Sequence, residues 1–298
     1  MMHLGTRESK LALWQAQKVQ SLLAEQNHET ELVLISSEGD VNLTTPLYEI
    51  GIQGIFTKTL DVALLQNKID IAVHSYKDVP TILAKGLCVA AVLERGHVGD
   101  VFVPGNLAYD FNNYCVIATS SMRRKAQWLN KYRQHAIDNI RGNVPTRLQK
   151  VKESNWTGAV FAKAGLVRLN LLPLNAIDLE WMLPAPAQGA VVVICRENDE
   201  KTKRICKKIN QRFTAMCTHA ERLVLSKLNE GCSLPVGALA IAEPGSTIFL
   251  RANVCSPDGE KKIEWEGRSH SSNLDEMINE CTEHILEQGA DKILNSLN

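Results

Sequence analysis

The 298-residue sequence lacks any apolar run of the roughly 18 residues that a membrane-spanning helix needs. Its first residues, MMHLGTRESKLALWQAQ, also lack the basic start and the apolar stretch of a secretory signal. We therefore expect a cytoplasmic protein without a membrane partner. The formal net charge is +0, so the composition gives no general bias toward nucleic acid, and any electrostatic function must come from local clusters of charge.

Closely spaced metal ligands are also lacking. The eight cysteines are scattered, without the CxxC pair or the His-x-x-His partner that zinc sites typically show. We expect no metal, and we expect free thiols in a reducing compartment. The sequence contains no internal repeat of fixed period and no low-complexity tract.

The length predicts two or three domains, because domains typically contain about 100 to 150 residues. Apolar spacing predicts a helix from about Glu8 to Asn27, and ELVLISSEGD predicts a strand that runs into a loop. The glycine- and proline-containing segment from Gly39 to Phe56 is typical of a mobile lid. TKTLDVALLQNK then predicts a helix, and IDIAVHS a buried parallel strand.

Three further segments each run from a β-rich stretch through a small-residue turn into a helix, which predicts an α/β domain with a largely parallel sheet. They are CVIATSSMRRKAQWL, NIRGNVPTRLQKV and GAVFAKAGLVRLNLL. After about Cys217, three β-like runs separated by Pro-Gly-Ser and Pro-Asp-Gly turns predict an antiparallel meander. An amphipathic helix from about Ser272 to Leu297 completes a separate, smaller α+β domain.

Positive charge is concentrated between Cys115 and Arg168, where eleven Lys and Arg residues face two acidic residues, an excess of nine. Many of these residues follow predicted strands, where open α/β sheets bind ligands and where helix N-termini present free N–H groups. Arginine binds a carboxylate or phosphate through two parallel hydrogen bonds. Three such clusters in about fifty residues favour a polyanionic ligand in a cleft over a solvated face with scattered ion pairs.

Nucleic acid is the less favoured polyanion. The basic clusters lack interleaved aromatic residues, and the sequence shows no helix-turn-helix or OB-like pattern.

The segment AVHSYKDVP places His74, Lys77 and Asp78 just beyond the end of a predicted strand. Asp78 either caps the turn before Pro80 or acts as an acid that stabilises a cation or transfers a proton. His74 fits an interior histidine better than a catalytic base.

Eight ordered motifs resemble the porphobilinogen deaminase (hydroxymethylbilane synthase) family over nearly the full length. They are GTRESKLALWQAQ, GIFTKTLDVALL, DIAVHSYKDVP, ATSSMRRKAQ, IRGNVPTRLQKV, AGLVRL, PAPAQGAVVVICR and EGCSLPVGA. Any one of them is a weak signal, whereas their order is specific.

The resemblance implies two doubly wound α/β domains like those of type II periplasmic binding proteins, and a small C-terminal α+β domain with an antiparallel sheet. We expect the first domain to comprise residues 1–93 and 187–212, the second residues 94–186, and the third residues 213–298. The third domain carries the cofactor cysteine on a loop. The resemblance also implies a monomer.

The resemblance further implies that Cys232 holds a dipyrromethane cofactor through a thioether, and that the apo-enzyme assembles this cofactor from its own substrate. Four porphobilinogen units then join the growing pyrrole chain, each losing ammonia. Hydrolysis releases the linear tetrapyrrole hydroxymethylbilane, an intermediate of heme biosynthesis. The acetate and propionate groups of the chain account for the many arginines, and Asp78 is the catalytic acid.

Other residues match family positions that bind the cofactor or the substrate carboxylates. Those matching cofactor-binding positions, besides Cys232, are Lys77, Asp78, Ser121, Arg123, Arg124, Arg147 and Gln188. Those matching substrate-binding positions are Arg7, Ser9, Arg141, Arg147 and Arg168.

The sequence departs from the family pattern at several positions. Gln53 replaces a usual lysine in the lid, and Lys163 replaces a small or apolar residue and adds a charge near the cleft. The other departures are Lys10, Ala118, Pro145, Ala187 and Glu230. None of them removes an acid, arginine or cysteine that the chemistry requires, and Pro145 suits an early helical position.

Two alternatives remain open on the residues alone. A non-catalytic binding module has the same architecture, because a fold alone does not determine function. A cysteine hydrolase would use Cys232 as the nucleophile with a histidine such as His219 as its base, but no oxyanion motif accompanies them.

Overall fold

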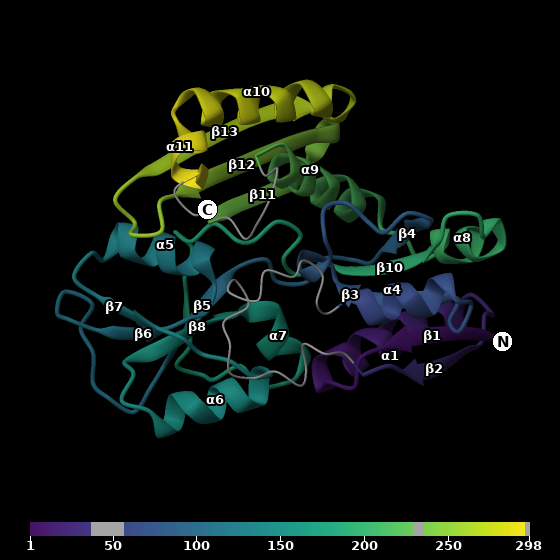
Figure 1. Cartoon of the computed structure of the whole chain (residues 1–298), viewed down its shortest axis with the longest axis horizontal. Coiled ribbons are helices and arrows are strands. Elements are labelled where there is room, and N and C mark those ends of the chain that lie inside the picture. Colours follow the sequence, from purple (N-terminus) through teal and green to yellow (C-terminus); the bar gives the residue numbers. More distant parts are fainter. Residues whose placement is uncertain (37–56, 229–234, 296–298) are drawn as a thin grey trace. The chain divides into compact units, whose positions relative to one another are not determined.

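The computed structural model describes residues 1–36, 57–228 and 235–295. These residues form two compact units (Figure 1). The first unit contains residues 1–36, 57–97 and 188–216, and the second contains residues 98–187, 217–228 and 235–295. The domain boundaries within the second unit stay a prediction, because residues 98–187 and the C-terminal segment fall together in it.

The first unit is built on a five-stranded sheet with the order β2-β1-β3-β10-β4. Its strands are β1 (Met2–Thr6), β2 (Thr30–Leu34), β3 (Ile71–Ser75), β4 (Leu87–Val92) and β10 (Val191–Arg196). Strands β2, β1 and β3 run parallel, whereas β10 runs antiparallel to both of its neighbours. The chain returns through β10 after it has formed the sheet of the second unit.

Helices cover both faces of this sheet. They are α1 (Lys10–Glu25), α4 (Lys58–Leu65) and α8 (Glu200–Lys207). The Ser9 side chain caps α1 by accepting a hydrogen bond from the backbone N–H of Ala12. Buried residues of α1 and α8, such as Val19 and Cys206, share one core with the sheet. Leu60 of α4 packs at Gly5, a position on β1 with no room for a side chain.

The second unit contains a sheet with the order β7-β6-β8-β5-β9. Its strands are β5 (Asp100–Pro104), β6 (Val116–Ala118), β7 (Ala136–Asp138), β8 (Gly158–Ala162) and β9 (Ile177–Asp178). Strands β7, β6 and β8 run parallel, and β5 runs antiparallel to β8 and β9. Its helices are α5 (Met122–Lys131), α6 (Val144–Glu153) and α7 (Lys163–Arg168).

Two separate cores show that this second sheet is also covered on both faces. Val151 of α6 and Leu166 of α7 belong to one core, and Trp128 of α5 belongs to the other. Ser121 and Asn143 cap α5 and α6 with their side chains, and Pro145 lies in the first turn of α6 as predicted.

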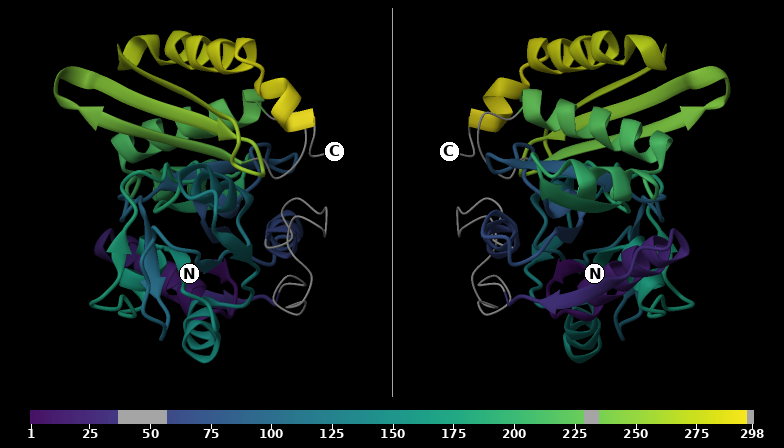
Figure 2. Two further views of the ribbon diagram at one scale, coloured as in Figure 1. Left: turned by 90° about the vertical axis from the view of Figure 1, so that its left-hand side faces the viewer. Right: turned by 90° about the vertical axis from the view of Figure 1, so that its right-hand side faces the viewer.

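The C-terminal segment forms a three-stranded antiparallel sheet of β11 (Val236–Glu243), β12 (Thr247–Cys255) and β13 (Lys262–His270). Helix α9 (Arg212–Leu228) precedes it, and α10 (Leu274–Glu287) and α11 (Ala290–Asn295) follow it. Figure 2 shows α10 lying along the strands of this sheet. The buried face of α10 includes Ile278, Cys281 and Ile285.

The predicted fold class is confirmed: two α/β sheets with helices on both faces, and a C-terminal antiparallel meander. Two details differ from the prediction. Both α/β sheets are mixed, because β10 and β5 run against their neighbours. The single C-terminal helix predicted to Leu297 is wrong, since Gly289 adopts φ +90° and separates α10 from α11. The whole of the predicted lid, residues 39–56, lies outside the described residues.

Candidate active site

The five predicted site residues of the first unit follow or precede strand ends at one edge of its sheet, which we call the Asp78 edge (Arg7, Ser9, Lys77, Asp78 and Gln188). β1 and β3 are parallel, so the residues that follow their carboxyl ends share this edge. β10 is antiparallel and pairs Val191 with Ser75, which brings the residues preceding β10 to the same edge. Because β10 runs antiparallel to β3, Gln188 lies beside Lys77, which precedes it by 111 residues in the sequence.

Hydrogen bonds hold part of the Asp78 edge. Lys77 donates from Nζ to Oε1 of Gln188 over 3.3 Å. Gln188 is buried, and its carbonyl oxygen accepts a hydrogen bond from Nε of Arg95 over 3.0 Å. Asp78 is the last residue of the short 3-10 helix η1 (Tyr76–Asp78), and it is exposed. The acid is thus presented to solvent beside a lysine that a buried glutamine orients.

His74 lies inside the sheet, as the sequence indicated. Burial, together with the positive charge of Arg7, lowers its pKa to about 4. Its Nε2 has no hydrogen-bond partner among the described residues. The imidazole is therefore neutral at physiological pH.

In the second unit, the predicted anion-binding residues follow three parallel strands. Ser121, Arg123 and Arg124 follow β6, Arg141 and Arg147 follow β7, and Arg168 ends α7, which follows β8. We call this set the arginine edge. Since β7, β6 and β8 are parallel, their carboxyl ends meet at one edge of the sheet. The Ser120 hydroxyl joins two of these turns by donating to the Ile140 carbonyl over 2.8 Å and accepting from its N–H over 3.0 Å.

Arg123 and Arg124 are buried and share the carboxylate of Asp100. One Nη of each guanidinium lies 2.8 Å and 2.7 Å, respectively, from an Asp100 oxygen. The other Nη of Arg123 donates to the Leu183 carbonyl over 2.8 Å, and that of Arg124 donates to the Val160 carbonyl over 3.0 Å. Two cations facing one anion leave a net positive charge inside the protein.

The other cations of this unit differ in exposure and pairing. Burial lowers the pKa of Arg141 and brings that of Arg168 to about 10, so both remain charged at neutral pH. Arg147 is half-buried and donates from Nε to the Gly142 carbonyl over 2.7 Å. Lys163 forms an ion pair with Asp178 at 2.7 Å. The extra charge predicted from Lys163 is therefore partly neutralised by an acid on β9.

Cys232, Gln53 and Glu230 lie outside the described residues. The other seven cysteines are free thiols.

Among the residues with described positions, no group of three or more His, Cys, Asp or Glu side chains is arranged to hold a metal ion. No helix in the described ranges is both long enough and apolar enough to span a membrane.

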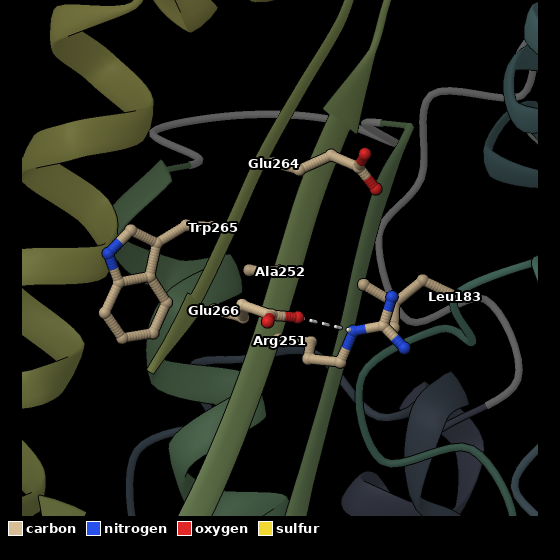
Figure 3. Close-up of a pocket in the computed structure, with 6 residues that line it drawn as sticks. All are labelled: Leu183, Arg251, Ala252, Glu264, Trp265 and Glu266. Carbon is tan, nitrogen blue, oxygen red and sulfur yellow. Dashed lines mark ion pairs between the residues drawn. The ribbon is translucent and has the colours of Figure 1, made fainter. Parts of the chain in front are cut away.

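A pocket lies on the C-terminal sheet. Its lining residues are Leu183, Arg251, Ala252, Glu264, Trp265 and Glu266. Figure 3 shows Glu266 turned toward Arg251, at 3.5 Å, so the main charges of this pocket face each other. None of the predicted site residues lines it.

Comparison with known proteins identifies the family. Residues 2–204 match the family model described as "Porphobilinogen deaminase, dipyromethane cofactor binding domain". Residues 215–287 match "Porphobilinogen deaminase, C-terminal domain". The chain belongs to the porphobilinogen deaminase family. Members of this family are transferases, also named hydroxymethylbilane synthases, so the non-catalytic module and the cysteine hydrolase are no longer favoured.

One curated relative agrees with this membership. A protein of Methanocaldococcus jannaschii named "Probable porphobilinogen deaminase" is 43% identical over 283 residues, which cover 93% of this chain and 96% of that protein. Among solved structures, the methionine-binding protein MetQ matches 70% of this chain and 89% of its own, with 11% identity and a TM-score of 0.43. A periplasmic substrate-binding protein from Coxiella burnetii matches 72% and 94%, with 12% identity and a TM-score of 0.43.

The residues of the arginine edge fit a cofactor that carries carboxylates. Arg123 and Arg124 retain a net positive charge after pairing with Asp100. Nε of each is buried and has no hydrogen-bond partner among the described residues. Buried guanidinium N–H groups without partners are costly unless an acceptor binds them, and a carboxylate is such an acceptor.

Sequence reasoning missed Asp100. The available signal was an acid at the start of an apolar strand, DVFVP, because a buried charge needs a partner. The identity of that partner depends on the fold, since Asp100 and the two arginines lie 23 and 24 residues apart in the sequence.

Proposed function

We propose that this protein joins four porphobilinogen molecules in turn, with loss of ammonia at each step, onto a dipyrromethane held by Cys232, and that it then releases hydroxymethylbilane by hydrolysis for heme biosynthesis. The observation that carries the proposal is the exposed Asp78 carboxylate at a strand-end edge, beside the Lys77–Gln188 hydrogen bond. When bound, the cofactor supplies the pyrrole carbon to which the first substrate ring is joined.

Asp78 stabilises the positive charge and transfers the protons of the reaction. Loss of ammonia from porphobilinogen leaves a positive charge on the pyrrole, and a nearby carboxylate stabilises that charge. Formation of the new carbon–carbon bond releases a ring proton, which the same carboxylate accepts. The short turn η1 places this acid beyond the end of β3, and its exposed side chain is accessible to a substrate.

The arginines bind carboxylates. Arg123 and Arg124 are buried and fixed by hydrogen bonds, which favours a ligand that stays in place, and we assign them to the cofactor with Ser121 and Arg147. On the Asp78 edge, Lys77 and Gln188 complete the cofactor contacts. We assign Arg7, Ser9, Arg141, Arg147 and Arg168 to the acetate and propionate groups of the incoming substrate and the growing chain.

An experiment with two variants tests the anchor and the acid separately. We expect wild-type protein to have an intact mass greater than its sequence mass by one dipyrromethane. Cys232→Ser removes the thiol that we propose forms the thioether, so this variant should lack the mass excess and be inactive. Asp78→Asn should keep the mass excess but lower kcat by about 10²- to 10⁴-fold, the usual contribution of a general acid or base.

The matched control for the anchor is Cys88→Ser, which changes a half-buried free thiol on β4 and should leave the mass excess unchanged. An active wild type without added mass would refute the covalent cofactor. Normal turnover by Asp78→Asn would show that Asp78 is only a turn residue.

A further inference from the structure

We propose that Asp100 is a positioning residue for cofactor binding: its buried carboxylate holds Arg123 and Arg124 in the arrangement that receives an anionic group. The inference rests on the proposed function, because it assigns these two arginines to the cofactor. Asp100 itself is not a cofactor ligand in this proposal and acts only through the two guanidinium groups.

The position of Asp100 follows from the strand register. It is the first residue of β5, and it pairs with Ala162, the last residue of β8. It therefore lies at the strand edge from which α5 begins with Ser121 as its cap. Its side chain is fully buried, and each of its oxygens faces a different arginine.

Each guanidinium is held at two points. Arg124 is fixed by Asp100 and the Val160 carbonyl on β8. Arg123 is fixed by Asp100 and the Leu183 carbonyl. The backbone of Leu183 is itself held by Gln127, which donates to the carbonyl over 2.9 Å and accepts from the N–H over 2.8 Å. These contacts leave Nε as the group on each arginine without a partner among the described residues.

An electrostatic role and a positioning role of Asp100 predict opposite changes in anion binding when the carboxylate is removed. Removing the carboxylate raises the net charge of the cluster, so a purely electrostatic role would make binding of an anion stronger. A positioning role makes binding weaker, because two guanidinium groups without a shared anion repel each other and lose their fixed orientation. The sign of the effect therefore separates the two roles.

Cofactor loading supplies the measurement. Apo-protein from cells that do not supply porphobilinogen is incubated with increasing porphobilinogen, and intact mass reports the fraction that has gained the covalent group. For Asp100→Asn we expect half-loading to need about tenfold more porphobilinogen than for wild type, the effect of losing a charge-assisted hydrogen bond. Half-loading at the wild-type concentration or below would overturn the inference.

Two further variants complete the test. Asp178→Asn removes an acid from the neighbouring strand β9, where it pairs with Lys163, and should load within about twofold of wild type because the arginines keep their partner. Asp100→Glu keeps the charge but displaces it by one methylene, so it should also load poorly. Normal loading of Asp100→Glu would overturn the inference even where Asp100→Asn fails to fold.

Thermal unfolding of apo- and loaded protein excludes a merely structural role. A structural role lowers both unfolding midpoints equally, whereas a positioning role reduces the rise in midpoint that accompanies loading. An unchanged rise in Asp100→Asn would contradict the inference. A wild type that gains no mass would instead refute the proposed function, and the inference with it.

Discussion

His74 and Asp78 lie only four positions apart, yet one is a buried core residue and the other an exposed acid. β3 carries His74 into the sheet, where burial and Arg7 disfavour its charged form. The chain then turns through η1 and exposes Asp78 to solvent. A strand and the turn that follows it therefore provide a neutral core residue and an accessible acid, respectively.

The lowered pKa of His74 predicts a loss of stability in acid. The unfolded chain binds a proton near pH 6.5 and the folded protein only near pH 4. The stabilising contribution is therefore complete above pH 6.5 and declines as pH falls toward 4, by roughly 3 kcal/mol in all. Urea unfolding of His74→Gln should show a shallower decline than wild type over this range.

The control is His284→Gln, which changes an exposed histidine on α10 and should leave the decline unchanged. An equally steep decline in His74→Gln would assign the acid sensitivity to other groups.

At the scale of elements, the segment that enters β10 depends on unusual backbone angles. Ala187 and Gly189 have φ +61° and +84°, in the left-handed region that favours glycine. This conformation explains why the family pattern has glycine where this chain has Ala187. Gln188 lies between them, so the backbone on both sides sets the direction of a predicted cofactor contact.

Gly189→Ala should be strongly destabilising. A Cβ at this position would lie 2.6 Å from the His97 carbonyl oxygen and 2.9 Å from that of Gly96. The left-handed conformation alone costs an alanine about 1 to 2 kcal/mol, and the backbone contact adds to this. We expect a loss of more than about 2 kcal/mol in the free energy of unfolding, measured by denaturant titration.

Gly99→Ala is the comparison, because nothing lies within 4 Å of a Cβ there. Similar stability of the two variants would show that the segment before β10 adapts easily.

At the scale of the whole molecule, charge is unevenly distributed. The net charge is +0, yet residues 115–168 have an excess of nine positive charges. Arg123 and Arg124 form ion pairs with Asp100, and Lys163 forms one with Asp178. Under the proposed function, this local positive field attracts the anionic substrate without making the whole protein basic.

Salt should therefore weaken substrate binding. We expect KM for porphobilinogen to rise as NaCl increases from about 0.05 to 0.5 M, because the Debye length shortens over that range. The cofactor should remain, because salt does not break the proposed thioether to Cys232. Sucrose at equal osmolality is the control, and a KM insensitive to salt would place the positive excess away from the ligand.

The sequence by itself determined the types of elements, the C-terminal meander and the presence of arginines after strands, because helical spacing, turn chemistry and strand ends are local properties. The ordered motifs also indicated the family. A local sequence pattern does not specify the direction in which a strand runs. The antiparallel orientation of β10, which brings Gln188 beside Lys77, could therefore not be predicted from it.

The tertiary structure alone decided which charges pair. Asp100 reaches Arg123 and Arg124, and Asp178 reaches Lys163, because strand register brings together residues that are distant in the sequence. A buried charge requires a partner, but only folding selects it. The motifs thus give the positions of the predicted site residues, whereas the residues that orient them depend on three-dimensional packing.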